Sequence, residues 1–329
     1  MKLIKAFIIG LATVLLLEFV FVSCAKEPPS PLRLGIVVWP SYESFYLARD
    51  LGYYGNAPIK LVDYPSDIEL LRSDRNGDLE AAAITLDETW SLAETDPDIR
   101  IVLIQDISNG GDAIVGKSTI KNLQDLKGQR VGVESTAGGA FVLSRALEKV
   151  GMTTKDVQIV SILETQQELA FKQGRIDALV TYEPNLSKLQ GIGAKLLFDS
   201  RQIPGEILDV VAMRESVVTK SVAADALING WFRALDYLQK HPDDVARRVA
   251  PHEGVTPEQF LKSLKGIHIP DVQENKKILT KTNKTSIEAV SRLAKFMVEK
   301  KLLKKAVNPI FVFDERLVNN IEVAMFTNK

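Results

Sequence analysis

Short apolar runs alternate with amphipathic stretches along the first two thirds of the chain. Residues 32–38 form a compact run rich in leucine, isoleucine and valine, which is typical of a buried strand. Residues 44–51 follow with apolar side chains at helical spacing. The pattern then predicts a strand at 59–64, a helix at 67–75 and a strand at 81–86. Alternation of this kind predicts βαβ units and an α/β fold with mainly parallel sheets flanked by helices.

The last third of the chain has a different pattern. After Ser221 the apolar positions fall at helical spacing over residues 222–239, 243–249, 257–264 and 286–300. These stretches have an apolar stripe and lysine-rich outer faces. We therefore expect these helices to pack against one lobe of the molecule and to carry no chemistry.

Two short patterns recur at one offset. Arg-Leu-Gly-Ile at 33–36 has a counterpart in Arg-Val-Gly-Val at 130–133, and Gly-Asp-Leu-Glu-Ala at 77–81 has one in Gly-Arg-Ile-Asp-Ala at 174–178; both pairs lie 97 residues apart. In the second pattern a helix is expected to end at the glycine, and an acidic residue precedes a buried strand. The repeat indicates two similarly built lobes, although any two α/β segments can share short patterns by chance.

These patterns predict a division of the chain into two lobes. Roughly 300 residues follow the apolar N-terminal run, which is more than one compact core usually holds. We expect lobe 1 to comprise residues 32–116 and 213–329, and lobe 2 to comprise residues 117–212. The chain would cross between them twice, near 109–117 and 203–213, and the two crossings would form a hinge.

The N-terminus carries the features of an export signal. Two lysines in the first five residues precede a nearly unbroken apolar run, Ala6–Val22, and the sequence turns polar after Ser23 and Cys24. A small residue followed by cysteine resembles the signal of bacterial lipoproteins, in which the cysteine is lipidated. We therefore expect a signal peptide at 1–23, lipidation of Cys24 and a proline-rich tether at 24–31. The alternative is a transmembrane anchor; either places the folded part outside the cytoplasm, in the periplasm or at the cell surface.

Composition and charge exclude several classes of function. Lys plus Arg number 41 and Asp plus Glu 42, a net charge of −1, which argues against nucleic acid as a partner. The sequence has three histidines, which show no metal-ligand spacing with cysteine or with each other. Neither a Gly-x-Ser-x-Gly elbow nor a P-loop is present. We expect no metal, no cofactor and no enzymatic activity.

Several motifs together identify a family. Trp39-Pro40-Ser41-Tyr42-Glu43, after the first strand, resembles the opening of nitrate/sulfonate/taurine-type ABC transporter substrate-binding proteins. The segments 125–133, 174–178 and Tyr182-Glu183-Pro184 resemble the same family. The resemblance implies a type II periplasmic-binding-protein fold, in which two lobes joined by two hinge strands close on a ligand. The family also includes proteins that bind thiamine-precursor pyrimidines.

Four loops follow the expected strands, and ligands bind beyond the carboxyl ends of the strands in open α/β sheets. These loops are 39–43, 85–87, 135–141 and 182–183. In the third, Ser135, Thr136, Gly138 and Gly139 precede an expected helix whose apolar spacing starts at Phe141. Free N–H groups at a helix N-terminus can bind an oxyanion, and the two hydroxyls add donors. An ordinary N-cap with a glycine-rich turn is the structural alternative.

The remaining candidate residues are acidic and aromatic, and Lys and Arg are absent from the four loops. The acidic side chains are Glu43, Asp87, Asp112 and Glu183, and the aromatic ones are Trp39, Tyr42 and Tyr182. A purely anionic ligand would meet repulsion from the carboxylates, whereas the rings can make cation–π contacts or stack on a heteroaromatic ring. This combination favours a zwitterion or an amine. The alternatives are helix capping or hinge hydrogen bonding for the acids, and core packing for the aromatics.

The sequence therefore predicts an extracytoplasmic solute-binding component of an ABC importer. It would capture a small zwitterionic, amine-bearing or sulfonate-type ligand between the lobes by hinge closure. Its partners would be the ligand, an ABC permease in the inner membrane, and the membrane itself through the lipid on Cys24; we expect a monomer. Two alternatives stay open: a protein that binds or synthesises thiamine-precursor pyrimidines, and a ligand-sensing receptor module.

Overall fold

The computed structural model describes residues 30–134, 136–305 and 307–321. The expected signal peptide, Cys24, most of the tether and Ser135 lie outside the described residues. From Leu32 onward the chain forms one compact unit. Within the described part, no helix has the length and apolar character needed to cross a membrane.

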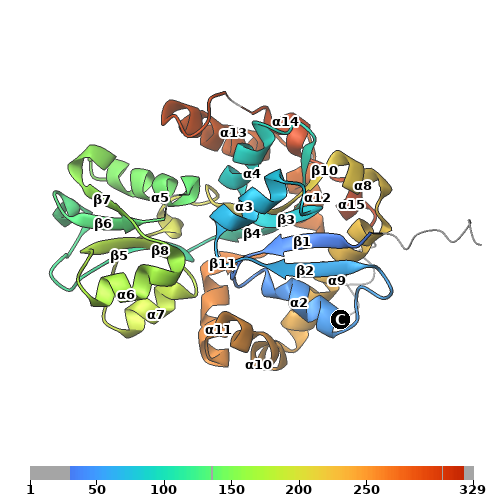
Figure 1. Ribbon diagram of the computed structural model, residues 1–329, viewed down its shortest axis with the longest axis horizontal. Coiled ribbons are helices and arrows are strands. Elements are labelled where there is room, and N and C mark those ends of the chain that lie inside the picture. Colours follow the sequence, from blue (N-terminus) through green and yellow to red (C-terminus); the bar gives the residue numbers. More distant parts are fainter. Residues whose placement is uncertain (1–29, 135, 306, 322–329) are drawn as a thin grey trace, which may run out of the picture. The chain divides into compact units, whose positions relative to one another are not determined.

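Sheet A has six strands in the order β11-β4-β10-β3-β1-β2 (Figure 1). β1 pairs in parallel with β2 and β3, whereas β10 runs antiparallel to β3 and β4, and β11 antiparallel to β4. The strands are β1 Leu32–Ile36, β2 Ile59–Asp63, β3 Ala81–Thr85, β4 Ile99–Ser108, β10 Leu208–Arg214 and β11 Ile267–His268.

Sheet B has five strands in the order β7-β6-β8-β5-β9. β6 pairs in parallel with β7 and β8, and β5 runs antiparallel to β8 and β9. The strands are β5 Asp112–Gly116, β6 Arg130–Val133, β7 Gln158–Ser161, β8 Ala178–Tyr182 and β9 Lys195–Asp199. The predicted α/β fold with two sheets is thus confirmed, but each sheet is mixed, because β10 and β11 in sheet A and β5 in sheet B run against the other strands.

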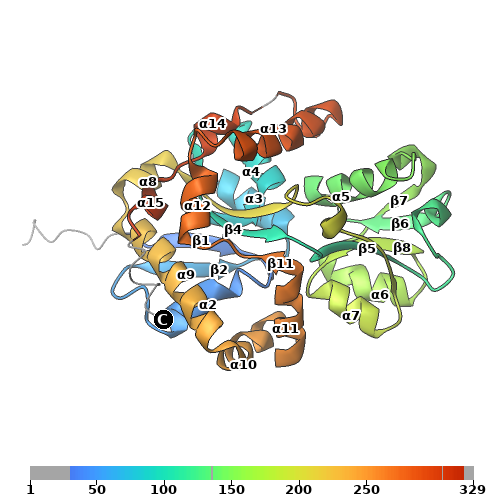
Figure 2. The same cartoon turned by 180° about the vertical axis from the view of Figure 1, so that it is seen from behind.

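Helices cover both faces of each sheet. In Figures 1 and 2, α5 lies on one face of sheet B and α6 and α7 on the other, while α3 and α4 lie opposite α2 and α9 across sheet A. The helices are α2 Glu43–Asp50, α3 Asp67–Arg75, α4 Leu86–Ala93, α5 Ala137–Glu148, α6 Gln167–Lys172, α7 Asn185–Gly191, α8 Glu215–Lys220, α9 Val222–Lys240, α10 Pro242–Glu253, α11 Pro257–Ser263, α12 Val272–Leu279, α13 Lys284–Glu299, α14 Pro309–Val312 and α15 Arg316–Asn319. The helix predicted at 67–75 is confirmed with the same bounds.

The chain passes from sheet A to sheet B between β4 and β5, and returns between β9 and β10. Sheet membership puts these passages at residues 109–111 and 200–207, a few residues before the expected lobe boundaries at 116/117 and 212/213. The division into lobes stays a prediction with this adjustment.

The repeat found in the sequence has a structural counterpart. The backbone N–H and guanidinium of Arg33 donate to the Glu80 carboxylate at 2.7–2.9 Å, and the guanidinium also donates to the Gly77 carbonyl oxygen at 3.2 Å. Arg130 makes the equivalent bonds to Asp177 at 2.8–3.2 Å and to the Gly174 carbonyl oxygen at 2.9 Å. The βαβ units of the two sheets therefore share the same local hydrogen-bond pattern.

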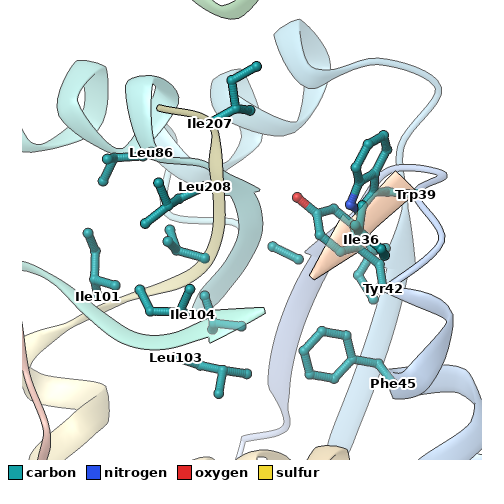
Figure 3. Packing of buried hydrophobic residues seen from close by; sticks show 14 of the residues in the cluster. Ile36, Trp39, Tyr42, Phe45, Leu86, Ile101, Leu103, Ile104, Ile207 and Leu208 are labelled. Atoms are coloured by element: carbon teal, nitrogen blue, oxygen red, sulfur yellow. The ribbon is translucent and has the colours of Figure 1, made fainter. Parts of the chain in front are cut away.

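The largest hydrophobic cluster includes side chains from both sheets and from the helices around them. Figure 3 shows Trp39, Tyr42 and Phe45 on the same side of this cluster as Ile36. Phe45 also packs against Trp231 of α9, with ring centroids 6.3 Å apart. Packing in the core therefore holds the segment that follows β1 in place without a ligand.

Candidate ligand-binding site

Two small adjoining cavities lie where strands of both sheets end. Each has a volume of about 50 Å³, and they share Asp67, Thr85, Asp112 and Tyr182 in their walls. The first, the aromatic cavity, is lined by Val37, Val38, Trp39, Tyr42, Asp67, Thr85, Asp112, Tyr182, Ile207 and Asp209. The second, the acidic cavity, is lined by Asp67, Thr85, Glu88, Asp112, Glu134, Thr136, Gly138, Gly139, Val142, Gln167, Val180, Thr181 and Tyr182.

Buried aspartates hold the aromatic residues that follow β1. The Trp39 indole N–H donates to Asp106 Oδ2 at 2.7 Å, and the Ser41 hydroxyl donates to the same oxygen at 2.5 Å. The Tyr42 hydroxyl donates to Asp209 Oδ1 at 2.5 Å. Burial raises the pKa of Asp106 to about 6. Because their polar atoms are already bonded to the protein, Trp39 and Tyr42 offer ring surface to the aromatic cavity.

Tyr182 connects the two sheets at the cavities. Its ring meets Trp39 edge to face, with centroids 6.0 Å apart. Its hydroxyl donates to Glu134 Oε2 at 3.3 Å. Tyr182 ends β8 of sheet B, whereas Trp39 follows β1 of sheet A, so one aromatic pair joins the carboxyl ends of strands from different sheets.

The acidic cavity gathers carboxyl groups without cationic partners. Among its described lining residues there is no Lys, Arg or His. Burial raises the pKa of Asp112 to about 7, and burial together with the neighbouring Asp87 raises that of Glu88 to about 8. Burial also raises the pKa of Asp67 and Glu134. Asp112 and Glu88 are therefore partly protonated at neutral pH, because the cavity wall supplies no opposite charge to stabilise the ionised form.

Several polar atoms in this cavity have no hydrogen-bond partner among the described residues. They are Glu134 Oε1, Asp112 Oδ2 and Gln167 Nε2. Glu134 is 4% exposed and Gln167 is 1% exposed. An unsatisfied buried polar atom costs about 1–3 kcal/mol, so a ligand that bonds to these atoms recovers free energy on binding.

The N-terminus of α5, which the sequence proposed as part of the site, borders the same cavity with Thr136, Gly138 and Gly139. The helix begins at Ala137, four residues before Phe141, and the Thr136 hydroxyl accepts a bond from Gly139 N–H at 3.3 Å. The structural alternative for Thr136, an N-cap, is therefore present. The buried Asp87 carboxylate lies close to Gly138, since a Cβ built there would be 3.4 Å from Asp87 Oδ2. The helix N-terminus thus already faces a carboxylate of the protein, which weakens it as a site for a second anion.

Two predicted site residues have structural partners elsewhere. Glu43 is 2% exposed, and its Oε1 lies 2.7 Å from His252 Nδ1 of α10. Glu183 accepts bonds from the Ser187 N–H at 3.0 Å and from the Ser187 hydroxyl at 2.9 Å, which caps the first turn of α7. Neither side chain lines the two cavities.

Sequence reasoning missed several residues of the site. Asp67 follows β2, Glu134 directly follows β6, and Glu164 follows β7. The rule that ligands bind beyond the carboxyl ends of strands, applied to every strand, points to all three. Burial and the neighbouring Glu134 raise the pKa of Glu164 to about 7, although Glu164 lines neither of the two cavities. Gln167, the first residue of α6, gave no comparable signal.

The described residues contain no group of three or more His, Cys, Asp or Glu side chains that could hold a metal ion.

Comparison with known proteins gives a consistent result. A model of the NMT1-like family matches residues 25–251. The putative thiamine biosynthesis protein of Haemophilus influenzae is 26% identical and covers 86% of this chain and 90% of its own length. The putative aliphatic sulfonates-binding protein of Escherichia coli is 25% identical over 61% of this chain and 64% of its own.

A solved structure shows the same fold. The crystal structure of the periplasmic aliphatic sulphonate binding protein of Escherichia coli superposes with a TM-score of 0.72 at 18% identity, covering 89% of this chain and all of that one. The resemblance that the motifs predicted is therefore confirmed for family and fold.

Proposed function

The chain belongs to the NMT1-like family, and on that premise we propose that it is the extracytoplasmic solute-binding component of an ABC importer. A relative named as a taurine-binding periplasmic protein and one named as a putative aliphatic sulfonates-binding protein support this function. Capture of a small molecule followed by delivery to a membrane permease is the corresponding mechanism.

One observation carries the proposal: loops from the ends of strands in both sheets line the same two cavities. Trp39 and Thr85 come from sheet A, whereas Asp112 and Tyr182 come from sheet B. A ligand bound there contacts both sheets at once. The ligand therefore stabilises the conformation in which the two sheets lie close together, because it binds that conformation more tightly than a more open one.

The walls of the cavities favour an amine-bearing solute over a simple anion. Carboxyl groups surround the acidic cavity, and the helix N-terminus there already faces Asp87. A sulfonate alone would place its charge among these carboxyl groups, whereas a zwitterion or amine brings a cationic end to them. The rings of Trp39 and Tyr182 can make cation–π contacts with that cationic end of the ligand.

The location and partners follow from the function. The folded part lies outside the cytoplasm, held to a membrane by a lipid on Cys24, and delivers its solute to an ABC permease as a monomer. Related proteins named as periplasmic support the extracytoplasmic location.

A role in thiamine metabolism is the second candidate, because a relative that matches 86% of this chain is named as a putative thiamine biosynthesis protein. Binding of a pyrimidine precursor would use the same cavities and the same aromatic rings. Synthesis would instead require turnover, which a binding assay followed by product analysis detects.

The proposal is tested with a candidate ABC permease and its ATPase from the same organism, reconstituted together in proteoliposomes. The full chain added with a small-molecule extract of growth medium should raise ATP hydrolysis several-fold, while either addition alone should not. ATP hydrolysis that is insensitive to the chain would contradict an importer function.

A further inference from the structure

A larger cavity adjoins the acidic one. It has a volume of about 570 Å³ and shares Glu88, Glu134 and Thr136 with the acidic cavity. We call it the outer cavity. Its lining is Ile68, Leu71, Arg75, Glu88, Ser91, Val133, Glu134, Thr136, Ala140, Leu143, Thr154, Ile159, Ser161, Met297 and Leu302. Eight of these fifteen side chains are apolar, whereas the acidic cavity has only Val142 and Val180 as aliphatic lining residues, so the outer cavity offers more apolar side-chain surface.

Helix α13 covers part of the outer cavity and packs against helices next to both sheets, whereas the sequence predicted packing against one lobe. Met297 of α13 and Leu302 just after it lie in the wall. α13 contacts α4, and its Phe296 meets Phe141 of α5 with ring centroids 5.0 Å apart. The outer cavity therefore lies between three groups of elements: α3 and α4 next to sheet A, α5 and strands of sheet B, and the C-terminal helix α13.

Glu134 lies at the boundary between the acidic cavity and the outer cavity. It lines both cavities, it is 4% exposed, and only Oε2 has a partner, the Tyr182 hydroxyl. Oε1 has no hydrogen-bond partner among the described residues. Of the described residues in the outer wall, Arg75 is the one basic residue, and its guanidinium donates to the Ser91 hydroxyl at 2.8 Å. A buried carboxyl group without a cation, next to an apolar space, matches a ligand that combines a positive charge with an apolar body.

Building on the proposed function, we propose that the solute is a small organic cation with an apolar body. The ammonium or amidinium group binds in the acidic cavity, where it donates to Glu134 Oε1 and Asp112 Oδ2. The apolar body extends into the outer cavity. A compact zwitterion such as taurine lacks the body, and an aryl sulfonate brings the wrong charge to Glu134.

The test uses four probes that separate charge from body, titrated by calorimetry into the full chain held in nanodiscs. 2-Phenylethylammonium carries both features, methylammonium has the charge alone, 2-phenylethanol the body alone, and 2-phenylethanesulfonate the opposite charge. We expect 2-phenylethylammonium to bind at least about tenfold more tightly than each of the others, since each lacks one favourable contribution or adds repulsion.

Three variants test where the charged group and the apolar body of the ligand bind. Glu134→Gln should weaken 2-phenylethylammonium at least about tenfold, because it removes the charge and keeps the shape. Ile159→Asn, in the outer wall and 54% exposed, should weaken it by about threefold to tenfold. Leu169→Asn, equally exposed at 55% but outside the three cavities, should leave binding unchanged.

The proposal is overturned if the sulfonate binds more tightly than the ammonium, if methylammonium binds as tightly as 2-phenylethylammonium, or if Glu134→Gln has no effect. It is also overturned if none of the four probes binds. The proteoliposome assay reports on importer function independently, so a stimulated ATPase together with no binding of these probes would reject the ligand class and retain the function.

Discussion

Trp39 and Tyr182 meet edge to face, with ring centroids 6.0 Å apart and planes inclined by 69°. One follows the first strand of sheet A and the other ends a strand of sheet B. Each ring is also hydrogen-bonded to a buried carboxyl group, Asp106 and Glu134 respectively. The aromatic pair and the carboxyl groups behind it therefore form one connected unit at the candidate site.

The bond from Trp39 to Asp106 should stabilise the free protein. Trp39→Phe keeps a ring but removes the indole donor, so we expect a loss of about 1–3 kcal/mol in the free energy of unfolding, measured by urea denaturation. Trp90→Phe is the matched control, because Trp90 is fully buried and its indole N–H has no partner among the described residues. Equal losses in the two variants would show that packing, and not the hydrogen bond, accounts for the effect.

The repeat makes a paired prediction about two glycines. A Cβ at Gly35 would lie 2.5 Å from Leu79 Cδ1, and a Cβ at Gly132 would lie 2.8 Å from Ile176 Cδ1. Gly35→Ala and Gly132→Ala should each destabilise the protein by about 1–3 kcal/mol through overpacking, as measured by thermal and urea unfolding. Gly191→Ala meets nothing within 4 Å and should not destabilise. A stable Gly132→Ala beside an unstable Gly35→Ala would contradict the structural equivalence of the two sites.

Glu253 should make stability depend on pH. It is 4% exposed, neither carboxyl oxygen has a partner among the described residues, and burial followed by the neighbouring Glu43 raises its pKa to about 9. A raised folded-state pKa means that the native protein binds the proton more tightly than the unfolded chain. The contribution of protonated Glu253 to the free energy of unfolding is therefore fully present below the pKa of the unfolded chain, about 4.3. It is lost as the pH rises to about 9.

Urea denaturation between pH 5 and 9 measures this dependence. Glu253→Gln, which cannot ionise, should have a flatter decline in stability with rising pH than the unmodified protein. The matched control Glu258→Gln concerns an exposed glutamate whose pKa is lowered, and should not flatten the decline. Identical slopes for the Glu253 variant and the unmodified protein would mean that Glu253 is already ionised in the fold.

The lipid anchor is tested by a single substitution. Cys24→Ser removes the only thiol in the chain and should shift the protein from the membrane fraction to the soluble fraction. Metabolic labelling with a radioactive fatty acid should mark the unmodified protein and not the variant. A Cys24→Ser protein that stays in the membrane fraction would favour an uncleaved transmembrane segment.

Local patterns predicted the fold well. The helix at 67–75 and the strands around it were found because apolar spacing and β-branched runs are set by neighbouring residues. The start of α5 was misplaced at Phe141, because its first turn holds only alanine and glycine and its start depends on the Thr136 cap. The antiparallel strands β5 and β10 were less predictable, since strand direction within a sheet depends on how the chain passes between the two sheets.

The site was predicted in part. The rule about carboxyl ends of strands predicted Trp39 and Tyr182, which line the aromatic cavity, because that rule needs only strand order, whereas Asp112 lines it from the first position of β5. The partner of Glu43 could not be anticipated, since His252 lies 209 residues away and reaches it only through the packing of α10 near α2. The acidic character of the loops was visible in the sequence, whereas the burial that raises the pKa values became visible only in the structure.

The most direct test of a cation site is the number of protons exchanged when 2-phenylethylammonium binds, measured by calorimetry at pH 7 in two buffers of different ionisation enthalpy. Asp112 and Glu88 have pKa values of about 7 and about 8 in the free protein, so an adjacent cation should ionise them and release about one proton. Affinity should correspondingly rise between pH 6 and pH 8. Net proton uptake on binding, or affinity that falls as pH rises, would contradict the account, because it would mean that the site binds its ligand through protonated carboxyl groups.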